Sequence, residues 1–455
     1  MSGTYDLIVL GAGPAGVAAA IIARRSGISV LVVEKDGFGG VCPLRGCIPK
    51  KILAVAAETM TCIRRSNEHG ITVKGAELNW KELIERKRWM IKDVSTDAQN
   101  RFHSLGIDTI NGFAKFSGPN SIDVDGKEYR AKKIVIATGS KPRKLPIPGF
   151  EHTLTSDDLF ELESLPPSVI FIGGGAIGME FAHIFTRAGS KVTILEAASR
   201  ILPDMDEDVI NELAGFTQSL GVEINTGVHV ESIEKTSQGA SVTMTVPNIT
   251  ISSTIEASLV ANGAGRVADI DGLDLHKAGV ETDHRGIVLD QYLRSVSNPD
   301  IFAAGDTVTL SPHLSPVASY EGRIAAQNIT LPDLVSPDYR VIPTAIYTIP
   351  SVAGVGLTEY EAKKQGLDFT TAVHDLLPLR VSSIYAEQAA YSKIIIDSSN
   401  DRILGAHIIG HNAQEIINVF ALAMKYHISA RDLHDTLYTF PTFSSGIPIM
   451  VRFRV

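Results

Sequence analysis

A glycine-rich motif that occurs twice constrains the fold of this 455-residue chain more than any other feature. In each copy, an apolar stretch is followed by Gly-x-Gly-x-x-Gly, an apolar segment of helical length and a second apolar stretch ending in glutamate. The glutamates, Glu34 and Glu196, lie 23 positions after the first glycine of each motif (34 − 11 and 196 − 173). A single motif is weakly diagnostic, but a strand–turn–helix context followed by an acid is typical of dinucleotide binding. The two copies predict two Rossmann-like units.

The glycines of both copies have a physical role in this interpretation. They allow a tight turn and a close approach of the backbone to a pyrophosphate, which the N–H groups and dipole of the following helix attract. The acid can accept hydrogen bonds from ribose hydroxyls. The first copy carries Gly11, Gly13 and Gly16, and the second carries Gly173, Gly175 and Gly178.

Composition excludes several classes of protein. Hydrophobic residues make up 44% and charged residues 20% of the chain, which is typical of a globular protein of roughly three domains. A net charge of −9 disfavours binding to nucleic acid or to acidic membranes. We expect no membrane span, because no run of about 18 apolar residues occurs, and no targeting peptide, because a strand begins directly after the N-terminus. Three cysteines do not form a secreted disulfide scaffold, so we expect a cytoplasmic protein.

Changes in sequence pattern indicate the domain boundaries. A Pro/Gly-rich connection follows "IVIATG", and "LVANGAGR" (259–266) and "IFAAGD" (301–306) each end a strand at a turn. Asp306, at such a strand end, is expected either at the sheet edge where α/β proteins bind ligands or as a solvated turn residue. The last third alternates strands with one apolar helix and lacks a nucleotide motif. We expect an α/β protein with a first nucleotide-binding domain (1–148), a second (149–262), a segment completing the first (263–335) and an α+β domain (336–455).

Two of the three cysteines, Cys42 and Cys47, lie in "GGVCPLRGCIPKK" (39–51). In a regular helix five residues turn the side chain by about 500°, which leaves the thiols about 140° apart and their Cα atoms too distant for a disulfide. A bridge therefore requires a distorted turn, for which Pro43 and Gly46 are suited. A helix that begins here would also favour a thiolate.

Three interpretations of the cysteine pair remain at this point: two separately buried residues, a zinc site and a redox-active dithiol. Zinc lacks a second pair of ligands, because the third cysteine, Cys62, is isolated and is expected in the core. We therefore expect no metal site. A redox dithiol next to a nucleotide site is the most specific of the three interpretations.

The cysteine motif, the two fingerprints, "ATG" (137–139) and "AAGD" (303–306) together resemble the class I flavoprotein disulfide reductases, also called pyridine nucleotide-disulfide oxidoreductases. This family includes dihydrolipoamide dehydrogenase, glutathione reductase and mercuric reductase. The similarity covers the whole chain, including "PTAIYTIPSVAGVGLTEYEAKKQG" and "ILGAHIIGHNAQEIINVFALAM". It implies FAD in the first unit, a nicotinamide dinucleotide in the second, and a homodimer that shares its active sites through the C-terminal domain.

The resemblance also implies a path for the electrons. Hydride would pass to the flavin and electrons would then reach a Cys42–Cys47 disulfide, with Cys47 as the flavin-proximal thiolate and Cys42 as the outer, interchange thiol. Lys51 would lie near the reactive edge of the flavin, paired with Glu180. The final acceptor would be a disulfide, a persulfide or a metal ion.

Residues that match the family's cofactor contacts are carried over one by one. Glu34 would bind the ribose of FAD and Asp306 its ribityl chain. The expected FAD contacts are Gly11, Gly13, Pro14, Ala15, Gly16, Glu34, Lys35, Gly40, Val41, Lys51, Ala114, Thr138, Gly139, Asp306, Leu314 and Ser315. The expected nicotinamide-cofactor contacts are Gly173, Gly175, Ile177, Gly178, Glu180, Glu196 and Gly265.

Charge near the second fingerprint predicts which nicotinamide cofactor is used. The Glu196 carboxylate can bind a free 2′-hydroxyl but would repel a 2′-phosphate. The following "AASR" offers one cation, Arg200. We therefore expect NADH rather than NADPH.

The chain departs from the family pattern near its C-terminus. Where relatives carry a His-Pro-Thr…Glu signature, which serves as acid and base for the interchange thiol, this chain has Phe440 and Ser445. An aromatic hydrocarbon cannot transfer a proton, and His434, six residues earlier, is expected to be a surface or packing histidine. The Phe440–Pro441 bond is expected to be cis, as in the family.

Three further departures concern the cysteine motif and the chain's end. Val41 and Leu44 replace a threonine and an asparagine of the family, and the C-terminal cysteine pair of mercuric reductase is not found. We expect an acceptor whose reduction needs no histidine base. The alternatives are an NADH oxidase, diaphorase or transhydrogenase, and a non-turnover FAD redox sensor.

Overall fold

The computed structural model describes residues 3–246, 252–283, 286–308 and 311–452. The chain forms two compact units. Unit 1 comprises Met1–Lys50, Glu85–Arg143 and Arg266–Tyr339, and unit 2 comprises Lys51–Ile84, Lys144–Gly265 and Arg340–Val455. The helices α3 (Cys47–Arg64) and α4 (Trp80–Ile91) each contain one of the points at which the chain passes from one unit to the other. The boundaries predicted at 148, 262 and 335 stay predictions.

Unit 1 is built on a parallel sheet with an antiparallel extension. The strand order is β3-β2-β1-β6, with β18 also parallel to β6 and the hairpin β5–β4 antiparallel to it. β2 is buried along its whole length, as expected for a parallel strand covered on both faces. The strands are β1 (Thr4–Leu10), β2 (Val30–Glu34), β3 (Asp108–Asn111), β4 (Ala114–Gly118), β5 (Ser121–Val124), β6 (Lys127–Ile136) and β18 (Ile301–Ala303).

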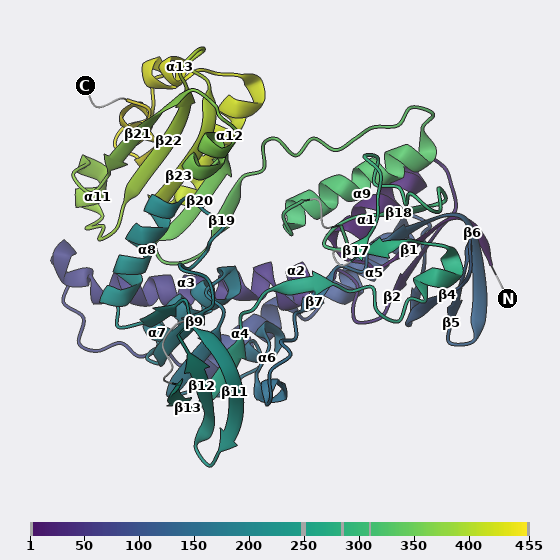
Figure 1. Ribbon diagram of the computed structural model, residues 1–455, viewed down its shortest axis with the longest axis horizontal. Coiled ribbons are helices and arrows are strands. Elements are labelled where there is room, and N and C mark those ends of the chain that lie inside the picture. The colour runs from purple at the N-terminus through teal and green to yellow at the C-terminus, as the bar shows by residue number, and fades with distance from the viewer. Residues whose placement is uncertain (1–2, 247–251, 284–285, 309–310, 453–455) are drawn as a thin grey trace. The chain divides into compact units, whose positions relative to one another are not determined.

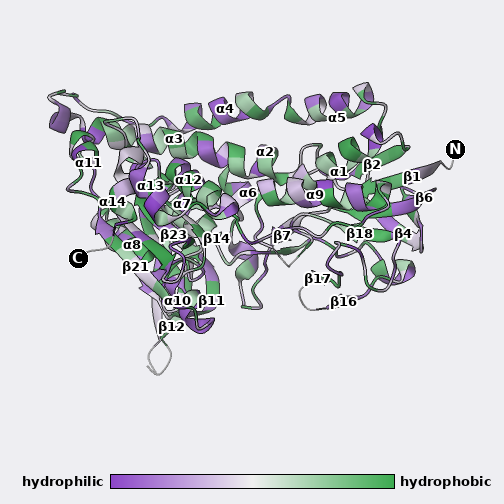
Figure 2. Ribbon diagram, turned by 90° about the horizontal axis from the view of Figure 1, so that it is seen from above, coloured by the Kyte–Doolittle hydropathy of each residue, from purple (hydrophilic) through white to green (hydrophobic). Residues whose placement is uncertain are grey.

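Alternating residues of β1 supply two separate cores. Leu7 and Val9 pack in one cluster with the helices, whereas Ile8 and Leu10 pack in another on the opposite face of the sheet. In Figure 1, α1 and α9 lie side by side over the sheet, and Figure 2 shows that α1 and the adjoining strands are largely hydrophobic.

The remaining elements of unit 1 are helices and two short strand pairs. They are α1 (Pro14–Arg25), α2 (Val41–Arg45), α5 (Val94–Ser104), α9 (Ser315–Thr330), the 3-10 helix η3 (Leu275–Ala278), and the strand pairs β7 (Ser140–Pro142) with β15 (Arg266–Ala268) and β16 (Thr282–Asp283) with β17 (Gly286–Ile287).

The first part of unit 2 repeats the nucleotide-binding pattern. Four parallel strands run in the order β10-β9-β8-β14, and a separate antiparallel sheet has the order β11-β12-β13. The elements are η1 (Ser66–His69), η2 (Phe150–His152), α6 (Ser156–Leu159), β8 (Ser168–Ile172), α7 (Ala176–Ala188), β9 (Lys191–Glu196), α8 (Glu207–Ser219), β10 (Glu223–Thr226), β11 (His229–Thr236), β12 (Gly239–Thr245), β13 (Ser252–Ala257) and β14 (Leu259–Asn262).

The last part of unit 2 is an antiparallel sheet of order β19-β20-β23-β22-β21, with α12 packed on β20 and β23 (Figure 1). The apolar side of α12 is buried in this core, as its sequence pattern predicts. The elements are β19 (Thr344–Ile346), β20 (Ser351–Gly356), α10 (Glu359–Lys364), β21 (Phe369–Asp375), α11 (Arg380–Ile384), β22 (Tyr391–Asp397), β23 (Ile403–Gly410), α12 (Ala413–Tyr426), α13 (Ala430–Asp435), η4 (Phe443–Gly446) and α14 (Ile447–Met450).

The predicted fold class is confirmed: two Rossmann-like folds occur with a C-terminal α+β domain. The Phe440–Pro441 bond is cis, as predicted, and Ile349–Pro350 is a second cis bond that the sequence did not predict. Within the described ranges, we find no helix with the length and hydropathy needed to cross a membrane.

Candidate functional site

The glycine turns of the two fingerprints have the same geometry. Gly11 has φ of 101° and Gly173 has φ of 110°, both in the region that favours glycine. A Cβ on Gly16 would lie 1.9 Å from Gly11 O, and one on Gly178 would lie 2.1 Å from Gly173 O. Each turn therefore brings the helix N-terminus against the end of the preceding strand, where a side chain would not fit.

The acid at the end of the second strand binds this turn in both units. Glu34 Oε2 accepts a hydrogen bond from Ala12 N at 2.7 Å, and Glu196 Oε2 accepts one from Gly174 N at the same distance. The other oxygens accept from Asp36 N at 2.8 Å and from Ala198 N at 2.7 Å. The carboxylates that are predicted to bind ribose are thus held by hydrogen bonds to the backbone of the glycine turns.

The cysteine segment lies against the first fingerprint because of two further glycines. Gly39 N donates to Ala12 O at 2.9 Å, and a Cβ on Gly40 would lie 2.5 Å from Gly13 Cα. Gly40, with φ of 71°, immediately precedes α2. The predicted proximity of the cysteines to a nucleotide-binding turn therefore has a direct physical cause.

The helix containing the cysteines is interrupted at Gly46. α2 ends before this residue, whose φ of −142° and ψ of −114° are not helical, and α3 begins at Cys47. This confirms that the segment is distorted between the cysteines, as a bridge requires. The two thiols are free in this structure, and their pairing as a disulfide stays a prediction.

The reduced thiols interact with each other and with α9. A hydrogen bond to Cys47, together with burial, raises the pKa of the Cys42 thiol. Cys47 Sγ also lies 3.6 Å from Ser315 Oγ, the first residue of α9. These contacts favour the protonated form of the Cys42 thiol.

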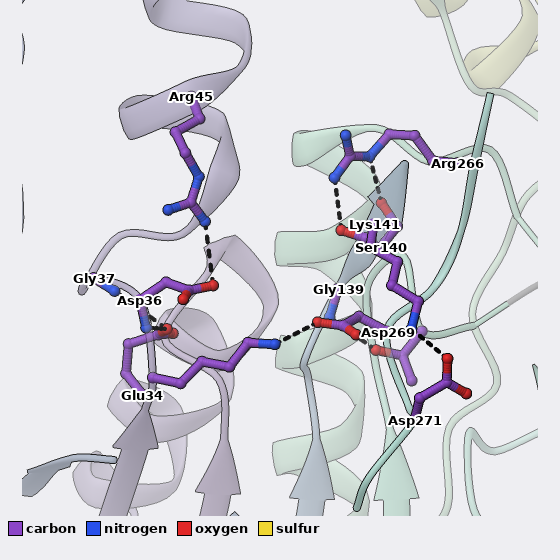
Figure 3. A network of polar contacts seen from close by, with 12 residues as sticks. Glu34, Asp36, Gly37, Arg45, Gly139, Ser140, Lys141, Arg266, Asp269 and Asp271 are labelled. Atoms are coloured by element: carbon purple, nitrogen blue, oxygen red, sulfur yellow. Dashed lines mark hydrogen bonds and ion pairs between the residues drawn. The ribbon is translucent and has the colours of Figure 1, made fainter. Parts of the chain in front are cut away.

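The predicted ribityl-binding residue, Asp306, is held by the neighbouring strand end. Ser140 Oγ donates to Asp306 Oδ2 at 2.8 Å. Arg266 donates to Ser140 Oγ at 2.9 Å and to Ser140 O at 2.6 Å (Figure 3). Gly139 N also donates to Thr307 Oγ1 at 3.1 Å. Ser140 and Thr307 directly follow "ATG" (137–139) and "AAGD" (303–306), and Arg266 ends "LVANGAGR" (259–266), but none of the three was predicted to belong to this site.

Lys35, an expected FAD contact, forms an ion pair on its own unit instead. Its Nζ lies 2.7 Å from Asp269 Oδ2, and Lys141 joins Asp269 to Asp271 in the same network (Figure 3). Nothing in this arrangement directs the Lys35 ammonium to a cofactor. Its assignment as an FAD contact stays a prediction.

The described residues fit an FAD group in one further respect. Thr138 Oγ1 is buried and has no hydrogen-bond partner among them. Thr138 and Gly139 follow β6, next to Gly11, whose added Cβ would lie 2.3 Å from Ala137 O. A buried hydroxyl without a partner is costly, so a polar ligand at this turn would satisfy it.

Unit 2 brings Lys51 and Glu180 to a common residue, Tyr347. Lys51 Nζ lies 4.6 Å from the centroid of the Tyr347 ring, and Tyr347 N donates to Glu180 Oε1 at 2.8 Å. Lys51 and Tyr347 line a cavity of about 140 Å³ within unit 2. The predicted direct pairing of Lys51 with Glu180 stays a prediction.

The other expected contacts lie on the elements that form these turns. Pro14 and Ala15 begin α1, Val41 begins α2, and Leu314 precedes α9. Gly112 N donates to Glu34 O, which brings the start of β4 at Ala114 toward the first fingerprint. In unit 2, Gly175 and Ile177 are at the start of α7, and Gly265 follows β14 with φ of 92°.

The residues that depart from the family pattern near the C-terminus are held in local contacts or exposed at the surface. Phe440 is exposed, Ser445 Oγ donates to Thr442 O within η4, and His434 is a surface residue paired with Asp435. One expectation is wrong: Cys62 is exposed rather than in the core. It lines the unit 2 cavity, on the same helix as Lys51.

Comparisons with known proteins cover nearly the whole chain. Residues 5–322 match the pyridine nucleotide-disulphide oxidoreductase family and residues 342–451 match its dimerisation domain. The chain is 33% identical to glutathione reductase from Burkholderia cepacia (97% of each chain) and 32% identical to dihydrolipoyl dehydrogenase from Bacillus subtilis (98% and 97%). The HOCl-induced flavoprotein disulfide reductase RclA from Escherichia coli has a TM-score of 0.87 at 27% identity, covering 97% of this chain and 98% of RclA, and its Cu(II) complex has a TM-score of 0.88. With these matches and the glycine turns and dithiol described above, the chain belongs to the pyridine nucleotide-disulfide oxidoreductases, as a flavoprotein disulfide reductase.

Proposed function

We propose that the protein is an NADH-dependent disulfide reductase that catalyses NADH + H⁺ + RSSR → NAD⁺ + 2 RSH. When FAD is bound, it supplies the redox chemistry that links two-electron hydride transfer to thiol–disulfide exchange. The observation that carries this proposal is that two thiols flank the helix break at Gly46, in a segment that packs against the first glycine turn.

The roles of the thiols follow from their environment and from the family pattern. The hydrogen bond to Cys47 and burial raise the pKa of the Cys42 thiol, and by the family pattern we assign the flavin-proximal thiolate to Cys47. Cys42 is the interchange thiol, whose attack on RSSR forms a mixed disulfide and releases RS⁻. Attack by Cys47 on Cys42 then releases the second thiolate and restores the Cys42–Cys47 bond. One proton from solvent and the one held on Cys42 leave with the two RSH products.

The preference for NADH rests on Glu196 and Arg200. The carboxylate of Glu196 is fixed at the second glycine turn, where it would repel a 2′-phosphate. Arg200, the one cation of "AASR", donates to the carbonyl oxygens of Leu202 and Pro203. Its guanidinium therefore binds the carbonyl groups of its own loop rather than a phosphate.

The acceptor is one that needs no histidine base. Phe440 and Ser445 supply no proton acceptor, and general acid–base catalysis contributes about 10²–10⁴-fold. We expect slow dihydrolipoamide turnover and faster reduction of a disulfide with a low-pKa leaving thiol, a persulfide or a metal ion. A Cu(II) complex is known for the related RclA, so Cu(II) belongs in the panel of acceptors.

We further propose a homodimer in the cytoplasm. The dimerisation domain at 342–451 supports a two-fold dimer in which the residues near Phe440 serve the partner subunit. Three cysteines in 455 residues support a reducing compartment.

One experiment tests the dithiol mechanism directly. Purified protein treated with one equivalent of NADH should develop a long-wavelength thiolate-to-flavin charge-transfer band. Cys47→Ser should lose the band, whereas Cys62→Ser, which changes a cysteine outside the motif, should keep it. Absence of the band in the wild type would contradict the proposal.

A second candidate function is an NADH oxidase, diaphorase or transhydrogenase, which the missing base at Phe440 favours. Cys42→Ser distinguishes the two functions. Full retention of NADH consumption with quinones or oxygen, and no disulfide reduction in the wild type, would support this candidate. Negligible steady-state NADH consumption with every acceptor would instead indicate a redox sensor.

A further inference from the structure

A buried acid in α9 has no role in the reaction as described so far. Glu321 lies in the interior of this helix with none of its surface exposed. A buried carboxylate is costly unless hydrogen-bond donors surround it. Gly305 N donates to Glu321 Oε2 at 2.7 Å, and the hydroxyls of Ser311 and Tyr339 each donate to Oε1 at 2.6 Å. Both carboxylate oxygens are therefore satisfied.

The donors identify the ionised form of this acid. Burial, the largest effect, raises the pKa of Glu321 above its ordinary value, although the three hydrogen bonds act in the opposite direction. Burial and the bond to Glu321 raise the pKa of Tyr339, so the phenol keeps its proton and donates it. Since no partner needs to accept a hydrogen bond from Glu321, the network suits a carboxylate rather than a carboxylic acid.

Two of the segments that Glu321 joins carry expected FAD contacts. Gly305 immediately precedes Asp306, and Ser311 precedes Leu314 and Ser315. The next residue of α9, Gly322, packs so closely on α1 that an added Cβ would lie 2.1 Å from Ala15 O. One turn of α9 therefore contacts three separate parts of the expected flavin site.

We propose that Glu321 is a positioning residue for FAD in unit 1, acting through the Gly305–Asp306 turn and the loop from Ser311 to Ser315. This inference rests on the proposed function, because it requires FAD to bind at Asp306. Glu321 itself contacts the backbone and hydroxyl groups that orient the site, and Tyr339 holds the second oxygen of its carboxylate.

The test is an FAD titration of the full-length apoprotein, followed by flavin fluorescence and the visible flavin spectrum. Glu321→Gln keeps the shape of the side chain but places an amide N–H₂ group against donors. We expect FAD to bind at least tenfold more weakly, which corresponds to about 1.4 kcal/mol, with a shifted flavin spectrum. Tyr339→Phe, which removes one of three donors, should weaken binding less.

Asn328→Asp is the matched control, because Asn328 is a buried residue of the same helix with three hydrogen bonds of its own. Its Nδ2 donates to Tyr292 O and Val335 O, both at 2.9 Å, and its Oδ1 accepts from Val335 N at 2.7 Å. Both variants should lower the melting temperature, but only Glu321→Gln should change FAD affinity and spectrum. Unchanged affinity in Glu321→Gln, or equal weakening in both variants, would overturn this inference alone. Failure of the wild type to bind FAD would overturn the proposed function as well.

Discussion

Glu196 Oε2 accepts a hydrogen bond from Gly174 N at 2.7 Å, which places a carboxylate at the mouth of the second glycine turn. The same relationship joins Glu34 to Ala12 in the first turn. In each case the acid is the last residue of the strand that follows the fingerprint helix. The acid therefore serves both to hold the turn and to present a negative charge where a ribose is expected.

The charge of Glu196 predicts the cofactor preference. We expect kcat/KM for NADH to exceed that for NADPH by at least tenfold in the wild type. Glu196→Gln should narrow this ratio, because the amide no longer repels a 2′-phosphate, and should raise KM for NADH. Steady-state kinetics with both cofactors measure the ratio. Equal use of both cofactors by the wild type would contradict the assignment.

The raised pKa of Cys42 predicts a rate that increases with pH. Below its pKa the thiolate fraction grows about tenfold per pH unit, and the thiolate is the attacking form. The second-order reaction of the NADH-reduced protein with a small disulfide should therefore accelerate from pH 6 to pH 9 without a plateau near neutrality. Stopped-flow measurement gives the profile. Phe440→His combined with Ser445→Glu should raise the rate near pH 7 and flatten the profile, and a plateau already present in the wild type would reveal another base.

Local patterns predicted much of this structure because their physical cause is local. The glycine turns, the acids at strand ends and the break at Gly46 all depend on residues within about 25 positions of one another. The polar frame around Asp306 depends on side chains far apart in sequence, such as Ser140 and Arg266. For Glu321 the sequence offers one signal, which is an acidic residue within a largely apolar helix. The hydrogen-bond partners of this acid cannot be inferred without the fold.

One assignment made from residue type is wrong, and another stays a prediction. Lys35 follows the ribose-binding acid and was expected at FAD, and its ammonium group pairs with Asp269, 234 positions later. Cys62 was expected in the core on the basis of its residue type, but its position on α3 faces an open cavity of unit 2. Tertiary contacts decide such cases, and a single sequence does not contain them.

The buried hydroxyl of Thr138 predicts opposite effects on the apoprotein and on cofactor binding. Thr138→Val removes a buried polar group without a described partner, so apoprotein stability should rise by about 1 kcal/mol. FAD affinity should fall, because the ligand loses a hydrogen-bond partner. Thr186→Val is the control: its hydroxyl is likewise buried without a described partner, but it lies in α7 of unit 2. It should stabilise the apoprotein similarly and leave FAD affinity unchanged, and the same loss of affinity in both variants would argue against a contact at Thr138.

The close contacts at Gly46 predict that a methyl group impairs the dithiol. A Cβ there would lie 3.0 Å from Val41 O and 3.3 Å from Cys42 Cα. Gly46→Ala should displace Cys42 from Cys47, slow disulfide formation and weaken the charge-transfer band. Gly215→Ala provides the control, because an added Cβ in this part of α8 meets nothing within 4 Å. Thiol titration after oxidation should find two extra free thiols in Gly46→Ala only, and complete oxidation of that variant would contradict the prediction.

The ammonium of Lys393 predicts a large contribution to the stability of unit 2. The side chain is only 4% exposed and pairs with Asp206 at 3.5 Å, Asp208 at 2.7 Å and Glu359. Burial alone would lower the pKa of Lys393, but the hydrogen bonds to Asp208 and Glu359 raise it above its ordinary value. Lys393→Met removes the buried cation that the three carboxylates share, although Glu359 keeps its ion pair with Lys363, and should cost about 3 kcal/mol at pH 7. Lys191→Met, which breaks an exposed pair with Glu223, should change stability by less than about 1 kcal/mol.

The dependence of this difference on pH has a definite sign. Hydrogen bonds to Lys363 and Lys393 hold the pKa of Glu359 below its ordinary value. The stabilisation from Glu359 is therefore complete above the unfolded-state pKa of about 4.3 and is lost as pH falls through the lower folded-state pKa. Thermal unfolding at a series of pH values should show the gap between wild type and Lys393→Met narrowing from pH 7 to pH 3. A gap that widens on acidification, or equal melting temperatures for the Lys393 and Lys191 variants at pH 7, would show that the buried cation is not what stabilises this part of unit 2.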